Sequence, residues 1–300
     1  MVNCIILGTI GIDNIKTPAG EKEVSIGGSA TYSAVAASFF TEPGIVSIIG
    51  DDFPQKTLEI LNKRKIDISK IIKKGKTFAW KGLYTGNMNE AKTIDTELNS
   101  LQDFDAVLPK EYKNAEYVFL GNLCPGLQIK VIEQLKAPKV IILDTMNFWI
   151  SSEKDSLLDA IKKVDILILN DAEARALFEE LNLRICAQKA LDELALKAII
   201  IKKGEHGAML FTKAQTFIMP GFPLANLKDP TGCGDSFGGT IIGYIAKNGY
   251  SPVNLRKAML YANVIASFNA EEFSFDKLIT LTDEQINERY EQMKRLMKVE

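Results

Sequence analysis

A glycine-rich stretch in the last third of the chain carries the residues best suited to phosphate chemistry. It reads Asp229-Pro-Thr-Gly-Cys-Gly-Asp235-Ser-Phe-Gly-Gly239 and runs into an apolar segment, residues 240–246, that predicts a buried helix. Glycines free the backbone for turns that a side chain would forbid, so that successive N–H groups can converge on one point. A helix that begins there adds its unpaired amides and the positive end of its dipole. The stretch therefore predicts an anion hole formed by the amides of Gly232, Cys233 and Gly234.

Asp235 places a carboxyl group beside these amides, in the first turn of the predicted helix, where an acid is favoured in any case. Such an acid can accept a proton from an attacking hydroxyl while the amides stabilise the charge on a transferring phosphoryl group. The plain alternative is a helix cap with a turn. The chain has no Gly-x-x-x-x-Gly-Lys-Ser/Thr string, so the predicted phosphoryl transfer does not use a lysine-containing phosphate loop.

The same string resembles the C-terminal signature of the ribokinase family, the PfkB-type carbohydrate kinases, which reads Asp-Thr-x-Gly-Ala-Gly-Asp-x-Phe. This chain departs from it at Pro230 and Cys233 and keeps the glycines and the acid. The resemblance implies an ATP-dependent kinase that phosphorylates a hydroxyl of a sugar or sugar-like small molecule, with Asp235 as general base. It also implies Mg²⁺ as cofactor and, as in parts of the family, a monovalent cation such as K⁺.

The elements that must position these residues follow an α/β rhythm. Short apolar runs alternate with helical segments, which predicts a doubly wound, mostly parallel sheet flanked by helices on both faces. The predicted strands lie at residues 3–10, 45–49, 117–120, 140–144, 165–169 and 198–202, with two antiparallel edge strands at 208–212 and 216–220. Helices are expected near residues 235–247, 252–269 and 282–297. We expect one ribokinase-like domain over residues 1–300.

Two further segments depart from this rhythm. Residues 76–98 contain strand-like runs interleaved with polar residues, and with residues 12–25 they predict a small antiparallel sheet with one solvated face. Such a sheet is not part of the main layer, so we interpret it as a lid. Family relatives often dimerise through the lid, which implies a possible homodimer by analogy.

Candidate acceptor-binding residues follow the first strand. The carboxyl ends of parallel strands are where sites assemble, and the resemblance places Asp13 on the acceptor's hydroxyls. Gly27 and Gly28 match the family's N-terminal signature, in which glycines let the backbone approach the sugar. The family usually has Asn where this chain has Tyr32. That aromatic residue could stack on a sugar face or a base, or simply fill space.

Candidate residues for the nucleotide and the metal follow later strands. Asn170 and Glu173 resemble the family's Asn-x-x-Glu motif, associated with Mg²⁺; Mg²⁺ takes few protein ligands and keeps several waters. From spacing alone, a helix cap followed by a first-turn glutamate fits equally well. Gly204 and Gly207 occupy the family's nucleotide-binding loop, and Lys202, where Thr is often found, could reach the nucleotide's phosphates. Asn263 matches a position near the adenine pocket.

Composition narrows the class of protein. The 36 Lys and Arg against 38 Asp and Glu give a net charge of −2 without a long basic run, so we expect no nucleic-acid partner. The four cysteines are scattered, no signal peptide is visible and no apolar run is long enough to span a bilayer, which together predict a soluble cytoplasmic protein without a membrane partner.

Other functions remain open at this stage. A nucleoside kinase of the same fold is the alternative within the kinase class. A non-catalytic sugar-binding relative would keep Gly27 and Gly28 and lose the acid, but Asp235 is present. A nicotinamide oxidoreductase requires Gly-x-Gly-x-x-Gly after the first strand, which residues 7–11 do not provide. His206 is the only histidine, which excludes a histidine-based triad or a multi-histidine metal site.

Overall fold

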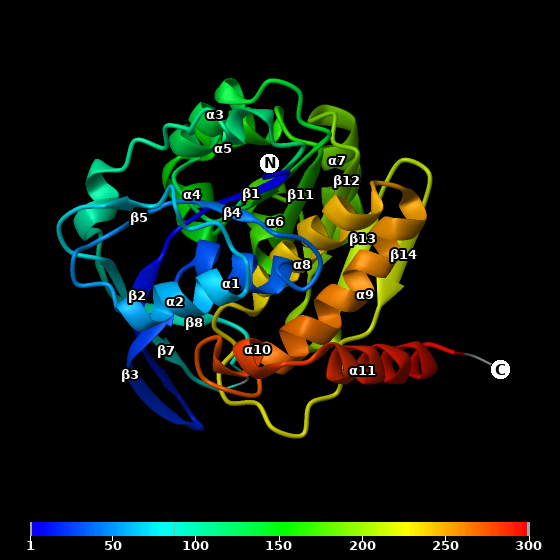
Figure 1. Ribbon diagram of the computed structural model, residues 1–300. Coiled ribbons are helices and arrows are strands. Elements are labelled where there is room, and N and C mark those ends of the chain that lie inside the picture. Colours follow the sequence, from blue (N-terminus) through cyan, green and yellow to red (C-terminus); the bar gives the residue numbers. More distant parts are fainter. Residues whose placement is uncertain (1, 87, 299–300) are drawn as a thin grey trace.

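The computed structural model describes residues 2–86 and 88–298, and its centre is an eight-stranded sheet (Figure 1). The strands of this sheet are β1 Cys4–Leu7, β4 Gly44–Val46, β9 Tyr117–Leu120, β10 Val140–Asp144, β11 Ile166–Asn170, β12 Ala198–Lys202, β13 Ala208–Phe211 and β14 Thr216–Met219. Their order is β14-β13-β12-β11-β10-β9-β1-β4. Neighbours from β4 to β12 are parallel, and β13 and β14 are antiparallel. The predicted mostly parallel sheet is confirmed.

Helices cover both faces of this sheet. On one face lie α1 Ser29–Ala37, α2 Gln55–Lys63, α8 Cys233–Asn248, α9 Pro252–Asn269, α10 Asp276–Thr280 and α11 Asp283–Leu296. On the other lie α3 Pro125–Gln134, α4 Asn147–Ser152, α5 Lys154–Ile161, α6 Asp171–Phe178 and α7 Leu183–Glu193. Successive strand residues alternate between the two cores, as Ile6 and Leu7 do. Each fully buried Ile or Leu contributes about 1.5–3 kcal/mol, which explains the continuous apolar strands.

A second, four-stranded sheet stands apart from the main one. Its strands, in the order β3-β2-β7-β8, are β2 Gly11–Thr17, β3 Gly20–Gly27, β7 Phe78–Tyr84 and β8 Ala91–Glu97. The predicted antiparallel pairing is wrong in one place, because β2 and β7 are parallel. These two strands come from segments far apart in the chain, so no hairpin fixes their direction. Position 87 of the predicted lid lies outside the described residues.

The predicted strand 45–49 is two strands. After β4 the chain leaves the main sheet at Ser47, whose hydroxyl donates to the Gly8 carbonyl. The next residues, β5 Ile48–Ile49, pair instead with β6 Ile72–Lys73. Three single-turn 3₁₀ segments, Asn99–Asp103, Tyr112–Asn114 and Gly204–His206, complete the described elements. The apolar run of residues 45–49 does not reveal that its second half pairs with a different strand from its first half.

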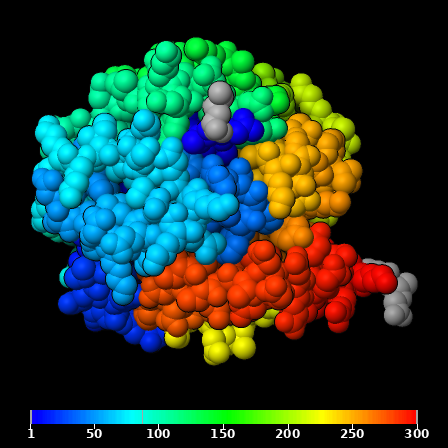
Figure 2. Space-filling view, viewed as in Figure 1, coloured from blue at the N-terminus to red at the C-terminus, as the bar shows by residue number. Residues whose placement is uncertain are grey.

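The small sheet contacts the segment before α10, as the adjacent blue and orange-red surfaces of Figure 2 show. The Ser274 hydroxyl donates to the Ile26 carbonyl, and Lys22 forms an ion pair with Asp276. The hydroxyl of Thr17 donates to the Lys228 carbonyl, just before the glycine-rich stretch. The small sheet is thereby tied to the loop that leads into α8. Within residues 2–86 and 88–298, no helix combines the length and the apolar character needed to cross a bilayer.

Candidate active site

The glycine-rich stretch forms the start of α8. Gly232 caps this helix with φ 75°, a left-handed conformation that favours glycine. A Cβ at this position would lie 2.3 Å from Cδ1 of Tyr32, so the aromatic ring also requires a glycine here. The amide of Cys233 donates to the Pro230 carbonyl at 3.1 Å. For the amides of Gly232 and Gly234, the described part of the chain supplies no backbone acceptor, which leaves both N–H groups available to an anion.

Asp235 lies in the first turn of α8 and is half-buried. Burial raises the pKa of its carboxyl group to about 7, with a further rise from Asp144 and an opposing effect of Lys202. A general base works best when its pKa lies near the working pH. A carboxyl group with a pKa near 7 is chemically suited to accept a proton at neutral pH.

Lys202 ends β12 and reaches the same helix start. Its ammonium nitrogen lies 2.9 and 3.1 Å from the two carboxylate oxygens of Asp144, which ends β10. The side chains are 17% and 4% exposed, so the ion pair is largely buried. The nitrogen also lies 3.0 Å from where a Cβ of Gly234 would be. The structure thus places a cation against the glycine whose amide is unpaired.

Asp13 lies in β2, and its carboxyl group is close enough to Asp229 and Asp235 for their charges to act on it. It is 3% exposed, and burial together with repulsion from Asp229 and Asp235 raises the pKa of its carboxyl group to about 8. A Cβ at Gly27 would lie 1.9 Å from its Oδ2, so only glycine allows this side chain to pack as it does. Gly28 caps α1. The buried Oδ1 of Asp13 has no hydrogen-bond partner among the described residues, which leaves it available to an acceptor hydroxyl.

Tyr32 fills the space between α1 and α8. It is 1% exposed, its ring covers Gly232, and it makes an edge-to-face contact with Phe275 at 6.3 Å between centroids. Its buried hydroxyl has no hydrogen-bond partner among the described residues. After burial, the charges of Asp229 and Asp13 are the next largest causes that raise the pKa of this phenol. The ring is thus a packing residue, and only its hydroxyl faces the acidic side of the site.

Asn170 and Glu173 form a capping box at the start of α6. The Asn170 side chain accepts from the Glu173 amide at 2.8 Å, and Glu173 Oε2 accepts from the Asn170 amide at 2.7 Å. Burial raises the pKa of Glu173 to about 7 against the opposing effect of Lys202. One oxygen of each side chain is committed to the helix cap. The remaining oxygen of Glu173 suits a magnesium ion held through water, because Mg²⁺ keeps most of its hydration shell.

The predicted nucleotide residues lie at the same edge of the sheet. Gly204 begins the 3₁₀ turn after β12 and Gly207 follows it, both at positive φ, and His206 is exposed between them. The Asn263 amide accepts from the Phe222 backbone at 3.1 Å and donates to the Pro220 carbonyl at 3.0 Å. Both ends of Asn263 therefore hold the loop that follows β14.

Sequence reasoning assigned no role to Asp144 or Asp229, and for Tyr84 it left a substrate mouth, a dimer contact and core packing of the lid open. Asp144 pairs with Lys202 across 58 positions, and the only signal was its place at the end of a strand. Asp229 is fully buried and accepts from the amides of Thr231 and Ser274, which shapes the approach to α8. Tyr84 accepts a 3.2 Å hydrogen bond from the Thr231 hydroxyl, linking the small sheet to the glycine-rich stretch.

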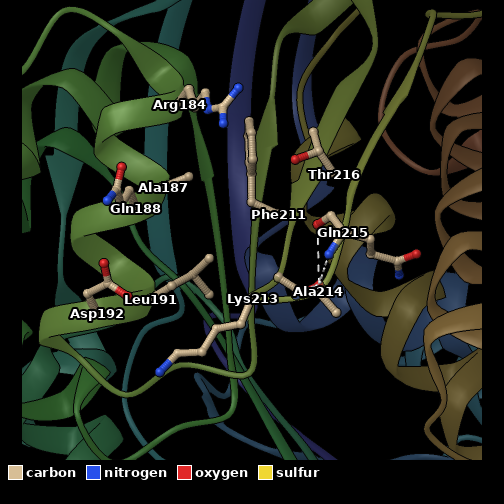
Figure 3. Close-up of a pocket in the computed structure, with 11 residues that line it drawn as sticks. Arg184, Ala187, Gln188, Leu191, Asp192, Phe211, Lys213, Ala214, Gln215 and Thr216 are labelled. Atoms are coloured by element: carbon tan, nitrogen blue, oxygen red, sulfur yellow. Dashed lines mark hydrogen bonds between the residues drawn. The ribbon is translucent and has the colours of Figure 1, made fainter.

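Two surface hollows are lined by other parts of the described chain. One of about 580 Å³ separates α7 from the β13–β14 turn, with Arg184 and Asp192 on one wall and Lys213 on the other (Figure 3). Phe211, which lines this hollow, pairs with Ile199 near the amino end of β12. Lys202 stands at the carboxyl end of the same strand, so the hollow lies at the other end of the strands from Lys202. The other, of about 640 Å³, borders residues 225–228.

Solved structures with the same architecture define the class. The putative ribokinase II of E. coli, solved in complex with ATP and Mg²⁺, superposes with a TM-score of 0.79 at 18% identity, over 97% of this chain and 99% of that one. The fold is therefore the ribokinase fold. The model of the pfkB family carbohydrate kinases matches residues 11–277, and the chain belongs to that family.

Two relatives narrow the class of activity. A cytidine kinase of Thermococcus kodakarensis is 28% identical over 254 residues, 81% of this chain and 89% of the relative. A nucleoside kinase of Methanocaldococcus jannaschii is 25% identical over 264 residues, 86% of this chain and 82% of the relative. The protein is a phosphotransferase that acts on a hydroxyl acceptor, a sugar or nucleoside kinase.

Proposed function

We propose that this protein is an ATP-dependent nucleoside kinase in which Asp235 is the general base. The observation that carries the proposal is the helix start of α8, where a carboxyl group of pKa about 7 stands beside unpaired amides and the Lys202 ammonium. An acid, backbone donors and a cation at one helix terminus are what transfer of an anionic phosphoryl group requires.

In the proposed step, the acceptor's hydroxyl oxygen attacks the γ-phosphorus of ATP. A new O–P bond forms, the bond from the γ-phosphorus to the β,γ-bridging oxygen breaks, and ADP leaves with that electron pair. Asp235 takes the hydroxyl proton. The amides of Gly232 and Gly234 stabilise the charge on the phosphoryl oxygens, with Cys233 joining them if its hydrogen bond to Pro230 opens.

Asp13 would hold the acceptor. Its raised pKa keeps it largely protonated at neutral pH, so it can both donate to and accept from a ribose hydroxyl. The Gly27 and Gly28 backbone would pass close to the sugar, and the Tyr32 hydroxyl would close the acidic side. A 5′-hydroxyl of a nucleoside is then the primary alcohol that faces Asp235.

The nucleotide would lie along the edge formed by Lys202, Gly204 and Gly207, with Asn263 supporting the adenine side through the loop that it holds. Magnesium, when bound, would neutralise phosphate charge and would be held by Asn170 and Glu173, mainly through water. A monovalent cation such as K⁺ is a further proposal; the buried Asn269 Oδ1, which has no partner in the described chain, is a suitable oxygen for it.

The relatives named cytidine kinase and nucleoside kinase, which match 81% and 86% of this chain, support a nucleoside rather than a free sugar as acceptor. The family's description as carbohydrate kinases supports a free sugar as the second candidate. The small sheet of β2, β3, β7 and β8 would act as the lid of one domain. All seven residues of its edge strand β8 are exposed, which supports a homodimer through the lid.

A panel of acceptors tests this function directly. Cytidine, uridine, adenosine, inosine, ribose and fructose are each incubated with the protein, ATP and Mg²⁺, and ADP release is measured. We expect a kcat/KM for one or more nucleosides at least tenfold above that for either sugar. Faster turnover of a sugar would replace the nucleoside with the second candidate, and ADP release without any phosphorylated product would refute a kinase.

A further inference from the structure

The buried ion pair between Lys202 and Asp144 is not explained by the fold. Replacing a buried ion pair with apolar side chains is often neutral or stabilising, because desolvation of the two charges offsets their attraction. Here the pair stands at the carboxyl ends of two strands, β10 and β12, on either side of the strand that ends at Asn170. A contribution to stability does not explain why this ion pair stands at the carboxyl ends of the strands.

The ammonium group points at the helix start of α8. It lies 3.0 Å from the Cβ position of Gly234, while both of its recorded hydrogen bonds within residues 2–86 and 88–298 go to Asp144. An ammonium group carries three N–H donors, and a carboxylate on one side leaves donor capacity toward the other. The nearby start of α8 is therefore within reach of the donors that Asp144 does not use.

The surrounding charge also calls for a cation. Asp144, Glu173 and Asp235 are carboxyl groups near this lysine, and a nucleotide's terminal phosphates would bring more negative charge to the same place. Without Lys202 the helix start would present acids to an anion. With it, a fixed positive charge stands where a transferring phosphoryl group would meet the amides.

We propose that Lys202 is a catalytic residue that stabilises the phosphoryl group during transfer, and that Asp144 is the positioning residue that holds its ammonium at the start of α8. The inference rests on the proposed kinase function and deepens it. Lys202 moves no proton: Asp235 takes the proton of the acceptor, and Lys202 contributes charge and a hydrogen bond. Because this charge acts mainly on the transition state, its loss lowers kcat more than it weakens nucleotide binding.

The test compares Lys202→Met with Lys197→Met. Lys197 also pairs with an aspartate, Asp165, at 2.7 Å, but at the amino end of the same strand and far more exposed. We expect Lys202→Met to lower kcat about 10²–10³-fold, the range seen when one donor to a developing oxyanion is removed. The Kd for ADP should change less than about fivefold, and Lys197→Met should retain wild-type kcat. A Lys202→Met kcat within threefold of wild type overturns the proposal.

The role of Asp144 is tested by Asp144→Asn alone and by the double variant Lys202→Met with Asp144→Asn. The double variant also serves as a stability control, because Lys202→Met alone leaves the Asp144 carboxylate buried without its partner. Asp144→Asn should lower kcat about tenfold. Adding it to Lys202→Met should cause no further loss, because Asp144 acts through the lysine. Losses that multiply in the double variant would overturn the positioning role. If the wild-type protein phosphorylates none of the acceptors, the proposed kinase function fails. If the wild-type protein is active and Lys202→Met is equally active, the kinase function stands and only the role of Lys202 fails.

Discussion

Substituting Gly232 with Ala tests the packing at the start of α8. At φ 75° an alanine costs about 1–2 kcal/mol of backbone strain. Its Cβ would lie 2.3 Å from the ring of Tyr32, which is fully buried and cannot swing away freely. Overpacking of this kind typically costs about 1–3 kcal/mol. We therefore expect Gly232→Ala to lower the free energy of unfolding by about 2–5 kcal/mol and to lower kcat, because the helix start must shift.

Gly75→Ala is the matched control. Gly75 has φ 70° and nothing within 4 Å of its Cβ position, so this variant carries the backbone strain without the collision. Urea denaturation of both variants isolates the contribution of the ring, and Gly232→Ala should cost less stability in a Tyr32→Ala background than in wild type. The reasoning is refuted if Gly232→Ala is no less stable than Gly75→Ala, or if it costs as much without the ring as with it.

Three further expectations concern acid chemistry and the nucleotide loop. With a pKa of about 7 for Asp235, kcat/KM should rise about tenfold per pH unit below neutrality and level off above it; a flat profile from pH 5.5 to 8.5 contradicts this. The folded-state pKa of Asp13, about 8, lies above the usual value of about 3.9. The folded protein thus binds a proton that the unfolded chain has lost, and stability falls as pH rises from about 4 to 8. Asp13→Asn should remove the part of this dependence that Asp13 causes, be more stable than wild type at pH 8 by on the order of 2 kcal/mol, and raise the acceptor's KM; equal denaturation midpoints at pH 8 would argue against it. Asn263→Ala should raise the KM for ATP about 3–10-fold, since two hydrogen bonds worth about 1 kcal/mol each hold the loop at Pro220 and Phe222; an unchanged KM would show that the loop keeps its shape without them.

Much of the fold could be predicted because each strand of the central sheet, except the edge strand β14, is a short apolar run buried on both faces. The start of α8 was predictable for a local reason. Two glycines and an acid within four residues favour a turn followed by the first turn of a helix, whatever the rest of the chain does. The change of partner after Ser47 was not, because a strand's apolar pattern does not record which neighbour it pairs with. The parallel pairing of β2 with β7 was missed on the same ground.

The site was predictable only in part. Strand ends indicated Asp13, Asn170 and Lys202 individually, but no local pattern joins Lys202 to Asp144, which comes from a strand two positions away in the sheet. At Tyr32 the sequence left stacking and space-filling open, and the ring's contact with Gly232 depends on two helices meeting. Asn170 and Glu173 form the capping box that their spacing allowed, and the second carboxylate oxygen of Glu173 is not used by that cap.

The most direct test of the central claim is the turnover of Asp235→Asn with ATP and the preferred acceptor, measured beside its affinity for ADP. Asparagine keeps the shape of the side chain but cannot take the hydroxyl proton. We predict a kcat lower by about 10²–10⁴-fold, with ADP bound as tightly as in wild type. Near-native turnover by this variant would contradict the assignment of Asp235 as the base.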